Sequence, residues 1–265
     1  MPFEARLCRV NVGSRVSGPC AALCGTAILL AAAVLVVGSP RVRAAPGTTG
    51  MSVFLDPGHS GVSDASMNRE VPNGRGATKP CQTSGTSTDD GYTEHAFNWD
   101  VTLRVQKELD AQGIRTQLSR PDDASPGPCI DQRADAANAM HANALVSIHA
   151  DGGPPGGRGF HVNYSAPPLN DVQAGASVQL ATTMRDVLVA GGLPESTYLG
   201  SKGLFGRADL AGLNLAEVPA VLVELGNMRN AEDAARMESP EGRQRYADAI
   251  VNGIVAYLSG VAPAS

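Results

Sequence analysis

Ala220-Val221-Leu222-Val223-Glu224 is the stretch that decides the fold, because its first four residues form the most strand-like tetrad of the 265-residue sequence. Four consecutive apolar residues predict a buried strand, and this strand ends on a carboxylate. Two further apolar runs end in a similar way. Ser52-Val53-Phe54-Leu55 leads into Asp56-Pro57-Gly58-His59, and residues 144–149 end on His149. Three predicted strands therefore carry ionisable side chains where they end.

Helical periodicity separates these strands. On one face of a helix predicted from about Thr93 to Gly113, four apolar residues recur at every fourth position: Phe97, Val101, Val105 and Leu109. By the same criteria, further helices are predicted over residues 131–141, 172–189 and 243–258, and further strands over 114–118 and 160–164. Strands that alternate with helices of this length predict an α/β fold, with a mainly parallel central sheet and helices on both faces. A second domain is not needed.

Two segments interrupt the alternation. Residues 61–91 contain few apolar side chains and many Ser, Thr, Asn, Asp, Gly and Pro, which predicts a long polar surface insertion. Loops of more than about 15 residues inside compact domains tend to be functional or mobile. Residues 152–159, with five Gly and two Pro, form a second predicted loop directly after a strand.

The first 44 residues have the order of a secretory signal peptide. Three arginines precede a mostly apolar run over residues 21–38, and Val42-Arg43-Ala44 provides a small-x-Ala cleavage site. We expect cleavage after Ala44, a folded domain over residues 45–265, and a secreted, periplasmic or cell-wall protein without stable membrane insertion. The alternative is an uncleaved membrane anchor, since the run is close to the roughly 17 residues that span a bilayer.

Charge and cysteine content narrow the function further. The net charge is −5, and loss of the leader would leave 16 basic and 25 acidic residues, which argues against a nucleic-acid partner. Of five cysteines, only Cys81 and Cys129 lie outside the leader, and an isolated pair in an oxidising compartment predicts a disulfide. Neither cysteine has the CxxC or CxxH spacing of a zinc site.

The ionisable residues at the strand ends suggest a metal site, because ligands bind at the carboxyl ends of parallel strands. A catalytic zinc has three protein ligands and an open position. His59 and His149 would supply two imidazoles, and Glu94, in the first turn of the helix after His59, would supply a carboxylate. Glu224 then remains for proton transfer.

The other three histidines are interpreted as structural. His141 lies late on a predicted helix, where an imidazole commonly faces solvent, and His161 lies on a predicted strand. His95 competes with its neighbour Glu94 for the ligand position. Consecutive helical residues point about 100° apart, so only one of the two can face the site.

Four motifs in this order resemble the zinc-dependent N-acetylmuramoyl-L-alanine amidases of the amidase_3 type, and a mycobacterial single-domain member in particular. The motifs are Leu55 to Gly61, Glu94 at the start of a helix, Ser147 to Asp151, and Val218 to Asn230. Ser119-Arg120, Arg133 and Ala137-Asn138 also match the family's pattern. The resemblance covers a core of about residues 52–258.

The resemblance implies a twisted, mainly parallel sheet and one zinc per chain, held by His59, Glu94 and His149. It also implies Glu224 as the catalytic acid/base for hydrolysis of the amide between N-acetylmuramic acid and L-alanine. Peptidoglycan or muropeptides would be the substrate, in cell-wall remodelling or turnover, and we expect a monomer. By position alone, Arg207 and Asn227 are candidates for substrate binding.

Two other functions remain open from the residues. A zinc peptidase that cuts within the stem peptide would use the same site chemistry. A non-catalytic peptidoglycan-binding protein would be marked by loss of a ligand or of the base, and all four residues are present.

The insertion is itself a departure from the family. His59 and Glu94 lie 35 positions apart, which is longer than the family leads one to expect, and the excess contains Cys81. The insertion could be a lid over the site or a passive, stapled loop.

Overall fold

The central sheet lies in the part of the chain that this computed structural model describes, residues 47–260. Its six strands are β1 (Ser52–Pro57), β4 (Arg115–Leu118), β5 (Ala144–Asp151), β6 (His161–Ser165), β7 (Leu204–Arg207) and β8 (Ala220–Asn227). They are ordered β4-β1-β5-β8-β6-β7, and only β6 and β8 pair antiparallel. The mainly parallel sheet is therefore confirmed, whereas the predicted leader lies outside the described residues.

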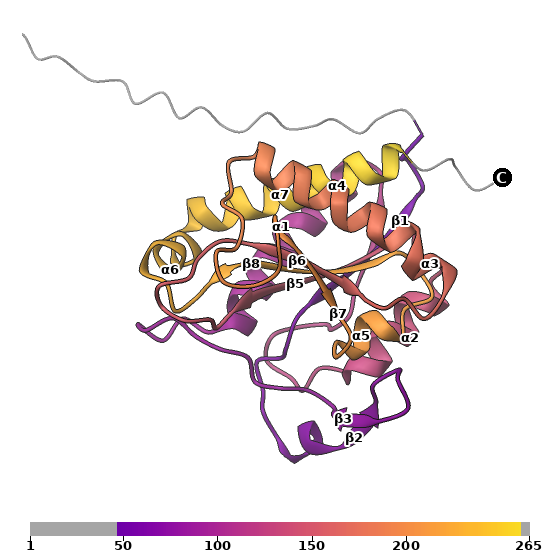
Figure 1. Cartoon of the computed structure of the whole chain (residues 1–265), viewed down its shortest axis with the longest axis horizontal. Coiled ribbons are helices and arrows are strands. Elements are labelled where there is room, and N and C mark those ends of the chain that lie inside the picture. The colour runs from indigo at the N-terminus through magenta and orange to yellow at the C-terminus, as the bar shows by residue number, and fades with distance from the viewer. Residues whose placement is uncertain (1–46, 261–265) are drawn as a thin grey trace, which may run out of the picture. The chain divides into compact units, whose positions relative to one another are not determined.

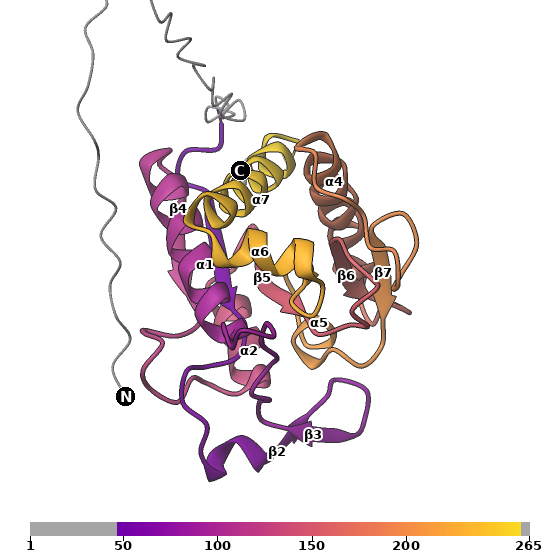
Figure 2. The ribbon, with the colours of Figure 1, turned by 90° about the vertical axis from the view of Figure 1, so that its left-hand side faces the viewer.

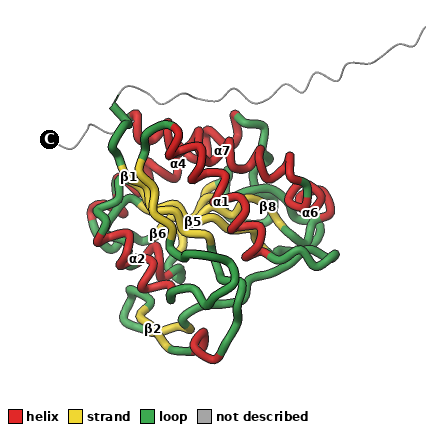
Figure 3. The backbone as a smooth tube through the Cα atoms, turned by 180° about the vertical axis from the view of Figure 1, so that it is seen from behind, coloured by secondary structure: helices red, strands yellow, loops and turns green. Residues whose placement is uncertain are grey.

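Helices cover both faces of the sheet (Figures 1 and 2). One face packs against α1 (Glu94–Ala111), α4 (Ala176–Ala190) and α7 (Pro240–Ser259), with α6 (Ala231–Glu238) at the end of α7. The other face carries α2 (Ile130–Ala139) and α5 (Ala211–Asn214), as the view from behind shows for α2 (Figure 3). A short α3 (Asp171–Ala174) precedes α4. None of the helices in the described part is long and apolar enough to cross a membrane.

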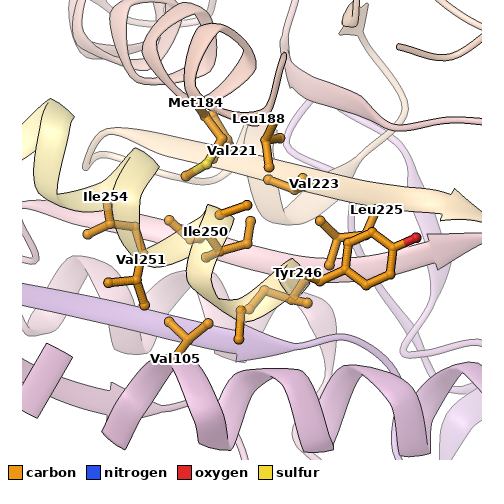
Figure 4. Close-up of a cluster of buried hydrophobic side chains, with 14 of the residues drawn as sticks. Val105, Met184, Leu188, Val221, Val223, Leu225, Tyr246, Ile250, Val251 and Ile254 are labelled. Atoms are coloured by element: carbon orange, nitrogen blue, oxygen red, sulfur yellow. The ribbon is translucent and has the colours of Figure 1, made fainter. Parts of the chain in front are cut away.

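The two faces of each strand enter different environments because successive side chains point to opposite sides. Val221, Val223 and Leu225 enter the larger hydrophobic core beneath α4 and α7 (Figure 4). The alternate residues, Ala220 and Leu222, pack in a smaller core beneath α2 and α5. Glu224 lies two positions after Leu222, so its side chain points to the same face of the sheet. α2 and α5 leave this face partly open.

Several elements differ from the expectation. The helix predicted over 172–189 is divided into α3 and α4, because Gly175 leaves helical geometry with φ −113° and ψ −81°. α7 begins three residues earlier than predicted, at Pro240, because the Ser239 hydroxyl caps it by accepting from Gly242 N. β7, α5 and α6 were not predicted, since each is too short to show a clear period.

The polar insertion is folded rather than irregular. It contains a short 3-10 helix, η1 (Ala65–Asn68), and an antiparallel pair, β2 (Glu70–Pro72) and β3 (Thr78–Pro80), which lie apart from the central sheet (Figure 2). The predicted disulfide is present: Cys81 and Cys129 are joined with an S–S distance of 2.04 Å. Because Cys129 is the residue just before α2, the bridge ties the insertion to the helix beside the open face.

Candidate metal centre and active site

His59, Glu94 and His149 converge at one point although they come from three elements. Glu94 Oε2 lies 3.0 Å from His59 Nε2, and Glu94 Oε1 lies 2.9 Å from His149 Nδ1. One ligand atom from each residue falls within 4.8 Å of the others, as binding of a single metal ion requires. The two imidazole rings meet edge to face, with 4.8 Å between centroids.

A sharp turn after β1 presents His59. Its φ of +62° is uncommon for a residue with a side chain. Gly58 is required just before it, because a Cβ there would lie 2.1 Å from the His149 ring. The Arg133 guanidinium fixes the turn by donating to His59 O at 2.8 Å. The same guanidinium donates to Asp56 Oδ1 at 2.7 Å, so β1, the turn and α2 are joined by one buried cation.

Asp56 is the carboxylate that balances this cation. It also accepts hydrogen bonds from Ser119 Oγ and Ser147 Oγ, each at 2.6 Å. Burial alone would raise the pKa of Asp56, but Arg133 and the two hydroxyls hold that pKa well below its usual range. Asp56 is therefore an ionised residue that positions the turn.

Glu94 lies in the first turn of α1, and both of its oxygens accept hydrogen bonds. Besides the two histidines, Thr86 N donates to Oε2 at 3.0 Å and Ala150 N donates to Oε1 at 3.3 Å. Burial opposes ionisation, but hydrogen bonds from His149 and His59 hold the pKa of Glu94 well below its usual range. Glu94 is thus kept as a carboxylate, the form that binds cations.

A backbone oxygen of the insertion orients the His59 ring. Its Nδ1 lies 2.7 Å from Thr83 O, which can only accept, so Nδ1 donates to that oxygen and Nε2 faces Glu94. Histidines that bind metals usually have such a partner on the other nitrogen. Thr83 belongs to the insertion, which therefore takes part in building the site.

Glu224 stands beside this cluster, directly opposite His149 in the pairing of β5 and β8. It lines a cavity of about 490 Å³, which the three clustered residues also line. Within residues 47–260, Glu224 Oε2 is buried without a hydrogen-bond partner. Burial, together with the charges of Glu94 and Asp151, raises the pKa of Glu224 well above its usual range.

The cavity continues from this polar end into an apolar one. Its apolar walls come from α2, from α5 and from the open face of the sheet: Ile130, Ala134, Leu145, Leu210, Leu213 and Leu222. Residues 79–86 of the insertion form another wall. An apolar cavity with a few convergent polar groups is the usual form of a ligand site.

The comparison with known proteins decides the family. Residues 53–256 match the family described as N-acetylmuramoyl-L-alanine amidase, Amidase_3. The chain belongs to this family. N-acetylmuramoyl-L-alanine amidase Rv3717 of Mycobacterium tuberculosis is 58% identical over 232 residues, which cover 88% of this chain and 96% of the relative.

Two solved structures agree with this assignment. The amidase Ami1 from Mycobacterium smegmatis superimposes with a TM-score of 0.81 at 61% identity, covering 81% of this chain and all of that one. Ami1 from Mycobacterium abscessus gives a TM-score of 0.79 at 60% identity, covering 79% and 99%. The α/β fold and the resemblance to a mycobacterial amidase are thereby confirmed.

The remaining histidines of this amidase-family chain lie outside the cluster. His95 does not face it, because its Nδ1 is paired with Asp123 at 2.9 Å. His141 is exposed just after α2. His161 is buried on β6, opposite Glu224 in the register.

The two residues expected to bind substrate have other partners. The Arg207 guanidinium donates to both oxygens of Asp209 and does not line the cavity. Asn227 is fully buried, and its side-chain amide donates to Pro154 O and Gly157 O, each at 2.8 Å. Asn227 therefore anchors the glycine-rich loop after β5.

No role in the site was predicted for the residues that support the cluster. Asp56 binds the guanidinium of Arg133, which holds the His59 turn, Thr83 O accepts from the His59 ring, and Thr86 N donates to Glu94. Asp56 had a signal, since a carboxylate follows three apolar residues of a buried strand. Thr83 and Thr86 act through backbone atoms, which a side-chain pattern does not reveal.

Proposed function

We propose that this protein is a secreted, zinc-dependent N-acetylmuramoyl-L-alanine amidase that cleaves the amide between N-acetylmuramic acid and L-alanine in peptidoglycan. The observation that carries the proposal is the cluster of His59, Glu94 and His149 at the polar end of a cavity, with the unpaired carboxyl of Glu224 beside it. Membership of the amidase family supports the choice of bond.

The donor set fits zinc. Two imidazoles and one carboxylate are the ligands of several catalytic zinc sites, which keep a further position open. The low pKa of Glu94 keeps its carboxylate deprotonated, and donation from His59 Nδ1 to Thr83 O leaves Nε2 as the His59 atom that would bind a cation after losing its proton. A zinc ion held there would supply Lewis-acid chemistry, polarising the scissile carbonyl and lowering the pKa of a water molecule.

Glu224 is proposed as the catalytic acid/base. In hydrolysis the water oxygen bonds to the lactyl carbonyl carbon, the C–N bond breaks, and the L-alanine nitrogen gains a proton. Glu224 lines the cavity on the strand next to His149, so its carboxylate can take the proton of the attacking water and return it to the leaving nitrogen. Burial favours the protonated form after that transfer.

Mass analysis of the products from purified muropeptides tests this proposal. We expect a sugar with a free lactyl carboxylate and a stem peptide with a free L-alanine amino group. A shortened stem that stays on the sugar would identify a peptidase instead. An intact muropeptide that is bound but never cleaved would identify a binding protein.

Export and oligomeric state are separate parts of the proposal. The leader of residues 1–44 would be removed, and the released protein would act as a monomer at the cell wall. The mass of the protein recovered from culture medium and wall should then correspond to a chain beginning at Ala45, and size-exclusion chromatography should give the mass of one chain. Recovery of the uncleaved chain in membranes would identify an anchor.

A further inference from the structure

A second unpaired polar side chain lies next to Glu224 in the sheet. His161 on β6 is 1% exposed, and its Nδ1 is buried without a hydrogen-bond partner in the described part of the chain. Glu224 Oε2, as described above, is in the same state. Buried polar atoms without partners are rare in native proteins, and each one calls for an explanation.

The sheet places these two residues side by side. β6 lies beside β8 in the sheet (Figure 1). The two strands run antiparallel, and His161 pairs directly with Glu224 in the register. Directly opposite residues project from the same face, with Cβ atoms about 5 Å apart. Glu224 lines the cavity and His161 does not.

The imidazole is enclosed by aromatic rings. Tyr198 and Phe205 meet it edge to face, with centroids 6.1 Å and 5.9 Å away. Burial, with the Arg207 charge adding to it, lowers the pKa of His161 to about 4, although Asp151 opposes the shift. The ring is therefore neutral at physiological pH, with one N–H donor and one acceptor.

We propose that His161 is a positioning residue for Glu224, donating from Nδ1 to the carboxylate and thereby fixing which oxygen faces the cavity. Such a hydrogen bond would give a partner to each of the two buried atoms. The proposal rests on the proposed role of Glu224. It also replaces the interpretation of His161 as a purely structural residue.

Two substitutions of His161 separate positioning from packing. His161→Phe keeps a ring between Tyr198 and Phe205 but has no donor, and His161→Asn keeps an amide N–H close to the position of Nδ1. We expect His161→Phe to lower kcat about 10- to 100-fold with KM, zinc content and melting temperature unchanged. His161→Asn should recover most of that loss. His141→Phe, the same change at an exposed histidine, is the control and should leave kcat unchanged.

Nitrogen-15 NMR of the histidine rings supplies a readout without turnover. We expect a proton on His161 Nδ1 and a clear change of its resonances in Glu224→Gln, because the acceptor becomes an amide. If the wild-type protein cleaves no muropeptide, the proposed function fails, whereas the NMR result still reports on the pair. A wild-type kcat in His161→Phe, no recovery in His161→Asn, or His161 resonances that ignore Glu224→Gln would overturn the inference.

Discussion

Two buried carboxyl groups line the cavity, and they differ in hydrogen bonding and in the direction of their pKa shifts. The ligand side, His59, Glu94 and His149, gives each oxygen of its carboxylate both a histidine and a backbone N–H. The base side, Glu224 and His161, leaves a buried polar atom unpaired on each residue within the described chain. Burial alone would raise the pKa of both Glu94 and Glu224, but hydrogen bonds from the two histidines lower the pKa of Glu94, whereas the charges of Glu94 and Asp151 raise that of Glu224 further.

This difference suits the two carboxyl groups to different tasks, one to holding a metal ion and the other to proton transfer. A carboxylate with satisfied oxygens and a low pKa stays ionised and keeps its geometry, which suits a metal ligand. A carboxyl group without donors can change its protonation state at little structural cost, which suits an acid/base. Each prediction below alters one side or its support and asks whether the other side changes.

Removal of a ligand should have the largest effect. His59→Ala and His149→Ala should lose bound zinc and essentially all hydrolysis, because two protein ligands hold the ion far less well than three. Chelation should abolish the activity of the wild-type protein, and added zinc should restore it. Metal analysis checks the variants, with His95→Ala as the control, since His95 is paired with Asp123. Full zinc occupancy in both ligand variants would show that the ligands are wrongly assigned.

Removal of the base should have the next largest effect. Glu224→Gln keeps the shape of the side chain but cannot accept a proton, so kcat should fall about 10²-fold or more. Steady-state kinetics on a muropeptide measure the change. Near-wild-type turnover in this variant would refute the role proposed for Glu224.

Loss of the Arg133–Asp56 ion pair, which supports the ligand side, should lower the stability of the folded protein. Arg133→Met leaves the Asp56 carboxylate buried without its cation, which should lower the free energy of unfolding by about 3 to 5 kcal/mol. Arg158→Met is the control and should cost less than about 1 kcal/mol, because Arg158 and its partner Glu232 are exposed. Urea denaturation of both variants measures the difference, and equal values would contradict the account.

This effect should also depend on pH. Because the pKa of Asp56 is lower in the folded protein than in the unfolded chain, its stabilising contribution is present above about pH 4. The contribution is lost as the pH falls toward the folded value. The gap in stability between wild type and Arg133→Met should therefore narrow below about pH 4.

Loss of the disulfide should have the smallest effect on the metal site. Cys81 and Cys129 are 48 positions apart, for which the chain-entropy model gives at most about 4 kcal/mol. The double variant Cys81→Ser, Cys129→Ser should therefore unfold at lower urea while keeping its zinc. Kinetics on wall polymers and on small muropeptides then decide between a lid and a staple. An unequal effect on the two substrates indicates a lid, and an equal effect indicates a staple.

The elements that build the ligand side were accessible from the sequence because their signals are local. The apolar run of β1, the four-residue period of α1 and the run of β5 each end or begin beside a proposed ligand. The ion pair of Asp56 and Arg133, which supports these elements, could not be predicted from the sequence. The two residues lie 77 positions apart and meet only in the folded chain.

The pairing of Glu224 with His161 on the base side could not be predicted either, because it depends on the strand order. Alternating strands and helices predict a mainly parallel sheet but do not give the strand order. His161 comes to lie beside Glu224 only because β6 joins the sheet antiparallel to β8. A buried strand histidine therefore had no visible partner in the sequence and was interpreted as structural.

Metal analysis of Glu94→Gln and Glu224→Gln, prepared side by side, tests the division between the two sides most directly. The chemical change is the same in both variants, and the two carboxyl groups line one cavity. The account predicts that Glu224→Gln retains one zinc per chain and that Glu94→Gln loses most of it. Equal zinc content in the two variants, whether full or lost, would contradict the account.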